Sequence, residues 1–123
     1  MNASARLVGF IPAADAGAAR NFYGEVLGLA LLSEDGFALV FDGGGGTHLR
    51  VVAAPPFEPQ RFTIAGWEVE DIAAEVATLA SRGVAFVRFM ADHDEAGIWT
   101  SPGGSKVAWF RDPDGNILSL TQG

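Results

Sequence analysis

The segment FRDPDGNILSL, residues 110–120, decides the fold because it has the pattern of a tight turn followed by a strand. Pro113 presets the backbone φ angle for the second position of such a turn, and Gly115 accepts a positive φ angle. Apolar residues on both sides predict the two strands of a hairpin, at 105–112 and 116–121. We therefore interpret DPDGN as a structural turn and not as a catalytic loop.

Length and charge favour one acidic domain without a nucleic-acid partner. The chain has 123 residues, enough to bury a core, and we expect a single domain over 1–123. Its formal net charge is −7, and it has no basic stripe that would follow a phosphate backbone. No apolar run reaches the roughly 18 residues of a membrane-spanning helix, and no secretory leader pattern is present. We expect a cytoplasmic protein without a membrane partner.

The residue types that are absent exclude several kinds of chemistry. The chain has no cysteine, which excludes disulfides, thiolate metal sites and a cysteine nucleophile. Its only histidines are His48 and His93, so a histidine-rich metal centre within one chain is excluded.

The first half, about 4–54, is predicted to form a strand, a helix and three further strands. Asp15 is a candidate N-cap of the helix, and Gly28 fits its C-terminal end. Pro12 is expected to end the first strand. The predicted elements are a strand at 5–11, a helix at 14–28 and strands at 29–34, 36–42 and 47–52.

A proline-rich linker at about 55–60 precedes a second half, about 61–122, in which the same order returns. Asp71 is the candidate N-cap of its helix, and Gly83 fits the helix end. The predicted elements are a strand at 61–69, a helix at 71–83 with Ile72, Val76 and Leu79 on one face, strands at 84–90, 105–112 and 116–121, and an irregular loop at 91–104.

Two constant offsets indicate an internal duplication. Val8 and Ile64 are 56 residues apart, as are the two N-cap aspartates, whereas Phe41 and Phe110 in the last hairpins are 69 apart. The difference of 13 residues matches the long loop. The chain is therefore predicted to be an α+β protein of two tandem βαβββ modules. The alternative is chance agreement, which any α+β chain shows at a few positions.

Three segments resemble the vicinal oxygen chelate superfamily, which includes glyoxalase I, bleomycin-resistance proteins, fosfomycin-resistance enzymes and extradiol dioxygenases. They are FYGEVLGL at 22–29, WEVEDIAAEVATLASRG at 67–83 and FRDPDGNILSL at 110–120. The resemblance spans essentially the whole chain. It implies a curved mixed sheet around a cleft, often completed by dimerisation, so a homodimer is expected.

The resemblance also implies four metal-ligand positions, which the metal-using members fill with His or Glu. Carried over by spacing from the motifs, these positions are Val8, Arg50, Ile64 and Ser119. Two are aliphatic, one is a cation and one is a neutral hydroxyl, so the set does not suit a divalent metal. We expect neither a metal site nor another cofactor, and Val8 and Ile64 either pack in the core or line a cavity.

Other polar residues offer alternatives. His48 and Arg50 are two residues apart and share a face of a strand. Arg50 suits a ligand carboxylate or phosphate, and His48 suits a general base, unless this face is merely solvated. The segment HDEAGIW, with His93, is interpreted as a solvated loop, with an adventitious metal site as the alternative.

Aromatic residues, concentrated in the second half, favour binding of a planar or amphipathic small molecule. Trp99 in the long loop fits a lid or stacking residue, or else a dimer contact or a cap on the core. We predict a bleomycin-resistance-like binding protein that sequesters its ligand. The candidate ligand-binding residues are Val8, Phe10, His48, Arg50, Ile64, Trp99, Trp109 and Ser119.

Two alternatives remain open. One is a glyoxalase-like lyase or isomerase, or a dioxygenase, using a divalent metal or acid–base work by His48 and Glu68. The other is a homodimeric scaffold without ligand chemistry. The acidic charge favours a cationic ligand, whereas Arg50, if it faces the ligand, favours an anionic one.

Overall fold

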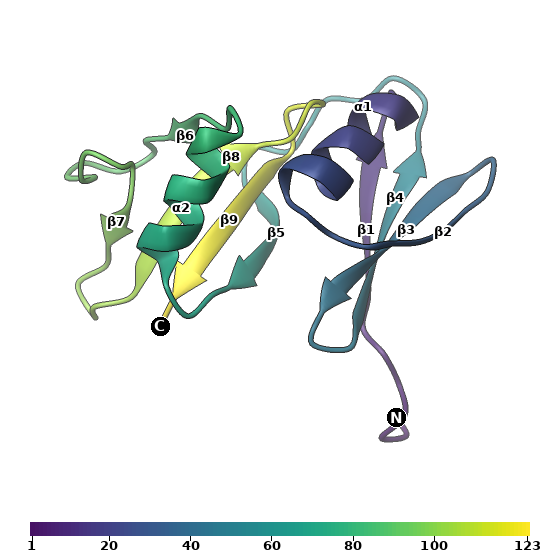
Figure 1. Cartoon of the computed structure of the whole chain (residues 1–123), viewed down its shortest axis with the longest axis horizontal. Coiled ribbons are helices and arrows are strands. Elements are labelled where there is room, and N and C mark those ends of the chain that lie inside the picture. Colours follow the sequence, from purple (N-terminus) through teal and green to yellow (C-terminus); the bar gives the residue numbers. More distant parts are fainter. The chain divides into compact units, whose positions relative to one another are not determined.

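The computed structural model describes residues 1–123, which form two compact units, Met1–Glu58 and Pro59–Gly123. Each unit is a mixed β-sheet with helix on one face (Figure 1), which confirms the predicted α+β class. The single domain with modules at about 4–54 and 61–122 stays a prediction. None of the helices is long and apolar enough to cross a membrane.

The first unit has a four-stranded sheet in the order β1-β4-β3-β2, in which β1 runs parallel to β4 and the other pairs are antiparallel. Its elements are β1 (Val8–Ala13), α1 (Ala16–Arg20), the π-helix η1 (Asn21–Val26), β2 (Leu31–Glu34), β3 (Ala38–Gly44) and β4 (Thr47–Ala53).

The second unit has a five-stranded sheet in the order β5-β9-β8-β6, with β7 paired to β8. Here β5 is parallel to β9, and the other pairs are antiparallel. Its elements are β5 (Thr63–Glu68), α2 (Ile72–Ser81), β6 (Phe86–Val87), β7 (Trp99–Thr100), β8 (Lys106–Arg111) and β9 (Ile117–Gln122).

Strand register supports the duplication inferred from sequence. Phe10 lies opposite Arg50 in the first sheet. Moving these positions by 56 and 69 residues gives Gly66 and Ser119, which lie opposite each other in the second sheet. The single shift of 69 also converts the pairs of β3 and β4 into those of β8 and β9. The two modules therefore share their pairing as well as their order of elements.

The core of the first unit lies between its helices and one face of its sheet. The ring centroids of Tyr23 on η1 and Phe41 on β3 are 6.0 Å apart, and both side chains are fully buried. Phe41 lies opposite Leu49 of β4. Because side chains alternate along a strand, Arg50 and its even-numbered neighbours on β4 point to the opposite face.

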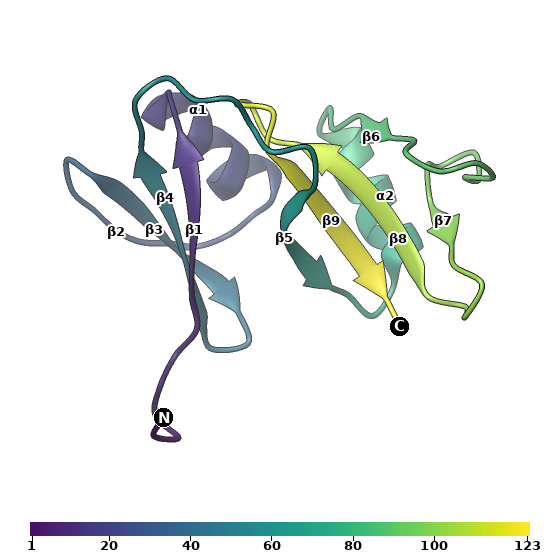
Figure 2. The ribbon, with the colours of Figure 1, turned by 180° about the vertical axis from the view of Figure 1, so that it is seen from behind.

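The second unit repeats this arrangement. Ile72, Val76 and Leu79 on α2 are buried, as predicted. The side-chain oxygen of Gln122 accepts a hydrogen bond of 2.8 Å from the N–H of Ile72, which places even-numbered residues of β9 toward the helix. Comparison of Figures 1 and 2 shows α2 on one side of β8 and β9 only, so the odd-numbered residues of β9 lie on a face that no helix of this unit covers.

The first strand lies later in the sequence than predicted. The sequence placed it at 5–11 and ended it at Pro12, but β1 begins at Val8 and continues through Pro12 to Ala13. Because β1 is an edge strand, a residue without an N–H is tolerated there.

The first predicted helix is correct in its ends but not in its regularity. Asp15 caps it by accepting a hydrogen bond of 3.1 Å from the N–H of Ala18, and Gly28 follows with a φ angle of +78°. Between Asp15 and Gly28 the helix changes from α to π geometry. In the π-helical part, the consecutive residues Phe22 and Tyr23 are both buried.

The prediction for 84–104 was wrong in two places. The strand expected over 84–90 is only the two-residue β6, and the loop expected at 91–104 contains β7. Trp99 therefore lies in a strand and pairs with Val107 of β8, not in an irregular lid. Two-residue strands are too short to produce a recognisable alternation.

The DPDGN turn has the predicted structure, and its carboxylate holds it together. One oxygen of Asp112 accepts hydrogen bonds of 2.9 Å from the N–H groups of Asp114 and Asn116, and the other accepts one of 2.9 Å from the Asn116 side-chain amide. Asp112 and Asn116 are buried, and Gly115 has a φ angle of +88°. The turn thereby joins β8 to β9 in a fixed register.

Asp112→Ala should lower the free energy of unfolding by about 1–3 kcal/mol, because buried N–H donors lose their acceptor. Urea unfolding followed by far-UV circular dichroism measures this. Glu70→Ala, which removes an exposed carboxylate, is the control and should change stability by less than about 0.5 kcal/mol. Equal stability of the two variants would contradict the assigned role of Asp112.

Candidate functional site

The helix-free face of the second sheet carries a cluster of rings centred on Trp109. We call Phe89, His93, Trp99 and Trp109 the Trp109 cluster. The Trp109 ring centroid is 5.7 Å from that of Phe89, 5.8 Å from that of His93 and 5.9 Å from that of Trp99. Trp109 lies opposite Ser119, on the side of β8 that points away from α2. Two predicted site residues, Trp99 and Trp109, are thus in contact.

His93 fixes the loop that completes this cluster. Its Nδ1 lies 2.8 Å from the carbonyl oxygen of Gly97, which can only accept, so Nδ1 carries the proton. Its Nε2 then accepts a hydrogen bond of 3.1 Å from the N–H of Met90. Both ring nitrogens are therefore occupied within the loop, which disfavours the alternative of an adventitious metal at HDEAGIW.

Ser119 is packed against a glycine on the neighbouring strand. Ser119 is only 7% exposed, and Gly66 lies opposite it on β5. A Cβ atom at Gly66 would overlap the Ser119 hydroxyl oxygen and would lie 2.9 Å from its carbonyl oxygen. The position that the resemblance assigns to a metal-binding carboxylate thus holds a small side chain in a tight space.

A hollow of about 250 Å³ adjoins the Trp109 cluster. It is lined by Arg61, Phe62, Thr63, Phe89, Trp109 and Ile117. Three of these residues are aromatic, none is acidic, and all belong to the second unit. An aromatic molecule in this hollow would lie against several rings at once.

The first unit brings four other predicted residues onto one face of its sheet. Val8 lies opposite His48, and Phe10 lies opposite Arg50. All four are on the side away from α1 and η1. Phe10 is 67% exposed. The predicted sharing of a face by His48 and Arg50 agrees with the strand register.

The two polar residues on this face differ in their partners. The Nε2 atom of His48 is 3.0 Å from a guanidinium nitrogen of Arg6, which can only donate, so this nitrogen acts as an acceptor. Arg50 is exposed and forms no ion pair within 4 Å. The Nε2 lone pair that His48 would need to act as a general base is thus used to accept a hydrogen bond from Arg6.

The four positions that the resemblance links to metal do not form a donor set. Val8, Arg50 and Ser119 have the placements described above, and Ile64 is half-buried at a register shift in β5. No group of three or more His, Cys, Asp or Glu side chains is placed to hold a metal ion. Aliphatic, cationic and hydroxyl side chains do not fit a divalent metal. The metal-free state of the protein stays a prediction.

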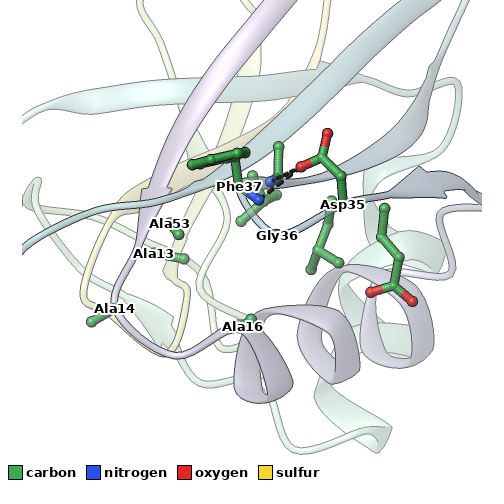
Figure 3. A pocket seen from close by; sticks show the side chains of 11 residues that line it. Ala13, Ala14, Ala16, Asp35, Gly36, Phe37 and Ala53 are labelled. Atoms are coloured by element: carbon green, nitrogen blue, oxygen red, sulfur yellow. Dashed lines mark hydrogen bonds between the residues drawn. The ribbon is translucent and has the colours of Figure 1, made fainter.

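A second hollow, of about 130 Å³, lies in the first unit between the start of α1 and the turn from β2 to β3 (Figure 3). Five of its eleven lining residues are alanines, and its two carboxylates are those of Glu34, which pairs with Arg20, and Asp35. The side chain of Asp35 beside it accepts hydrogen bonds of 2.7 and 2.9 Å from the N–H groups of Phe37 and Ala38. These bonds are drawn in Figure 3. Because this carboxylate is used by the turn, the hollow offers little chemistry.

The hydrogen bond from Phe37 and then that from Ala38 hold the pKa of Asp35 below its usual value. Desolvation opposes them more weakly, and the nearby charge of Arg50 adds the smallest lowering effect. The same two hydrogen bonds hold the turn between β2 and β3, with this carboxylate as their acceptor.

Sequence reasoning missed several residues of the second-unit site. It did not select Phe62, Phe89 or His93 for ligand binding, nor the cations Arg61 and Arg111. Val87 pairs with Trp109, so alternation along 87–89 would have placed Phe89 beside Trp109. The predicted strand at 84–90 already put Val87 and Phe89 on one face, but the sequence did not show that Val87 lies opposite Trp109. Arg61 and His93 lie in loops, where no periodicity of the sequence indicates which way a side chain points.

The fold and the site describe a small α+β protein of paired βαβββ modules with an aromatic hollow. The family profile of the Glyoxalase/Bleomycin resistance protein/Dioxygenase superfamily matches residues 5–120, and the chain belongs to this superfamily. No curated protein matches the chain significantly.

Solved structures with the same fold include TnmS3, an antibiotic binding protein from Streptomyces sp. CB03234. It shares 29% identity with the chain at a TM-score of 0.78, over 99% of this chain and 98% of that one. A glyoxalase/bleomycin resistance protein from the same organism shares 29% identity at a TM-score of 0.74, over 96% and 100%. A glyoxalase family protein from Bacillus anthracis, at 18% identity and a TM-score of 0.74 over 96% and 93%, shares the fold.

Gly66→Ala should destabilise the second unit by about 1–3 kcal/mol, because the new methyl group overlaps Ser119. Gly36→Ala is the matched control, since no atom lies within 4 Å of its added methyl group. Thermal unfolding of both variants measures the difference. The packing described for Ser119 is contradicted if Gly66→Ala unfolds at the same temperature as Gly36→Ala.

Asp35→Ala should be less stable than the parent protein at neutral pH but not in strong acid. The pKa of Asp35 is lower in the folded than in the unfolded chain, so its stabilising effect is present above the unfolded value of 3.8 and fades as pH falls through the folded value. Melting temperatures of both proteins between pH 7 and pH 2 test this. A constant difference over that range would contradict it.

Proposed function

We propose that the protein binds a planar aromatic small molecule without a metal, and sequesters it as an antibiotic-binding protein does. The Trp109 cluster carries this proposal, because it offers several ring faces around one partly exposed indole beside a hollow. Aromatic rings of a ligand gain both buried area and favourable ring geometry against such a surface. Because sequestration involves no reaction, the site needs no catalytic side chain.

The similarity to TnmS3 also supports a ligand-binding function. That protein is an antibiotic binding protein, and the two chains match over nearly their full lengths. We therefore infer a ligand of antibiotic type that lies on the helix-free face of the second unit, where the predicted residues Trp99, Trp109 and Ser119 are found. The predicted binding residues Val8, Phe10, His48 and Arg50 lie together on one face of the first unit, and their role in binding stays a prediction.

The chemistry of the ligand positions supports binding without metal. Arg50 would repel a divalent cation, and Ser119 is a weak neutral donor that is packed against Gly66. A metal-dependent lyase, isomerase or dioxygenase would need other donors. Acid–base catalysis by His48 is disfavoured because its Nε2 atom contacts Arg6. Glu68, the other predicted acid–base residue, is not hydrogen-bonded to His48 or His93.

We also propose that the protein is a cytoplasmic homodimer. Leu7 and Leu32 are 73% and 50% exposed in the single chain, and burying apolar side chains favours association. A second copy would bury such surface. Sedimentation equilibrium at micromolar concentration should give twice the chain mass of 12.9 kDa, and a monomer throughout would contradict this part of the proposal.

The proposal is tested by metal analysis combined with a ligand screen. The protein is loaded with Ni, Zn, Fe or Mn, desalted and analysed, and well under one equivalent of each metal is expected. A thermal-shift screen of aromatic antibiotics with and without EDTA should find stabilisation that EDTA leaves unchanged. Saturation at 100 times the dissociation constant stabilises the folded protein by about 2.7 kcal/mol. Stoichiometric metal, or stabilisation that EDTA abolishes, would contradict metal-free binding.

Trp109→Ala should weaken binding of any ligand found in this screen by at least about tenfold, because the central ring is lost. Phe37→Ala is the matched control, since it removes an exposed aromatic ring from the first unit. Isothermal titration calorimetry compares the three proteins. If both variants bind as the parent does, the Trp109 cluster is not the site.

A further inference from the structure

We propose that the ligand of the second unit carries a negative charge, so that it is an aromatic acid such as an aryl carboxylate and not an aromatic cation. This inference rests on the proposed function, because it concerns the hollow beside the Trp109 cluster. It specifies a ligand class that neither the superfamily nor the similar structures define.

Two arginines flank the aromatic floor of the hollow. Arg61 belongs to its lining together with Phe62 and Trp109. The guanidinium carbon of Arg111 lies 5.6 Å from the ring centroid of Phe89, which also lines the hollow. Arg111 is two residues from Trp109 on β8 and therefore points to the same face. Cationic groups thus lie next to the ring faces that would hold the ligand.

Neither arginine is neutralised by the protein. The ion pair between Arg20 and Glu34 lies in the first unit, Arg61 and Arg111 form no ion pair within 4 Å, and no acidic residue lines the hollow. Acidic residues outnumber basic ones by 15 to 8 in this chain, so arginines without an acidic partner are not explained by a shortage of carboxylates. Arg88, by contrast, donates to the carbonyl oxygens of Asp94 and Glu95. Arg61 and Arg111 retain their donors for another molecule.

The geometry suits a carboxylate attached to a ring system. A guanidinium group presents paired N–H donors that match the two oxygens of a carboxylate. A ligand whose ring contacts Trp109 and Phe89 brings a substituent at its edge toward Arg111, and Arg61 in the lining supplies a second cation. An aromatic cation would meet two like charges and no carboxylate.

Three naphthalene probes of equal shape test the charge preference. They are 2-naphthoate, the neutral 2-naphthamide and the cationic 2-naphthylmethylamine, each titrated into the whole protein by isothermal titration calorimetry at pH 7. We expect 2-naphthoate to bind about tenfold more tightly than the amide, because it gains charge-assisted hydrogen bonds, and the amine to bind most weakly. Added salt should weaken binding of the naphthoate alone.

Variants assign the preference to the two arginines. Arg61→Gln and Arg111→Gln should each bring the affinity for 2-naphthoate toward that for the amide, whereas Arg111→Lys should keep most of the preference. Lys106→Gln is the control, because it removes one positive charge from the other end of β8. All four proteins should bind the neutral amide equally, since the aromatic floor is unchanged.

The outcomes separate the two proposals. Equal binding of the three probes, or a naphthoate preference that survives both glutamine variants, would overturn the proposed anionic ligand and leave the aromatic site intact. A preference lost equally in Lys106→Gln would also overturn it, because net charge and not the site would then be responsible. Binding of none of the probes would contradict the aromatic site itself, and the charge proposal with it.

Discussion

The carboxylate of Asp112 determines which residues the second sheet presents to a ligand. By accepting three hydrogen bonds within the DPDGN turn, it fixes the register in which β8 and β9 pair. In that register Trp109 lies opposite Ser119 and both point away from α2. Because side chains alternate along a strand, a slip by one residue would turn Trp109 into the helix-covered core. The aromatic site therefore depends on a buried turn that does not touch it.

The two modules have the same pairing but different chemistry on their helix-free faces. The first presents Arg50 between Phe10 and Val40, and the second presents Trp109 at the position equivalent to Val40. Arg50 and Ser119 occupy equivalent places, yet one is exposed and the other is packed against a glycine. The same backbone frame thus supplies a charged surface in one unit and a surface of clustered aromatic rings in the other. A binding function needs such surfaces, and it needs no metal to form them.

Much of the fold could be predicted from sequence because local chemistry specifies it. Both N-cap aspartates, the turn at DPDGN and the repeated order of elements follow from short-range rules that depend on few neighbours. The shared face of His48 and Arg50 followed from the two-residue period of a strand. These features are encoded within a few residues of each other.

The remainder depends on contacts between distant segments. The change to π geometry in η1 accompanies the burial of two consecutive aromatic rings, which a helical period does not reveal. Trp99 joins Trp109 only because the two-residue β7 pairs with β8. His93 was considered only as a loop residue or a metal ligand, because its hydrogen bonds to Met90 and Gly97 are visible only in the structure.

The location of the ligand is tested most directly by the indole N–H signals of the three tryptophans in a ¹H–¹⁵N spectrum of the labelled protein, assigned by single Trp→Phe variants. Trp99 and Trp109 lie on the helix-free face, whereas Trp67 lies opposite Leu120, on the side of the sheet that faces α2. On titration with 2-naphthoate, the signals of Trp99 and Trp109 should shift together and saturate, and that of Trp67 should stay in place. A saturating shift of Trp67 with the other two unchanged would contradict binding at the Trp109 cluster.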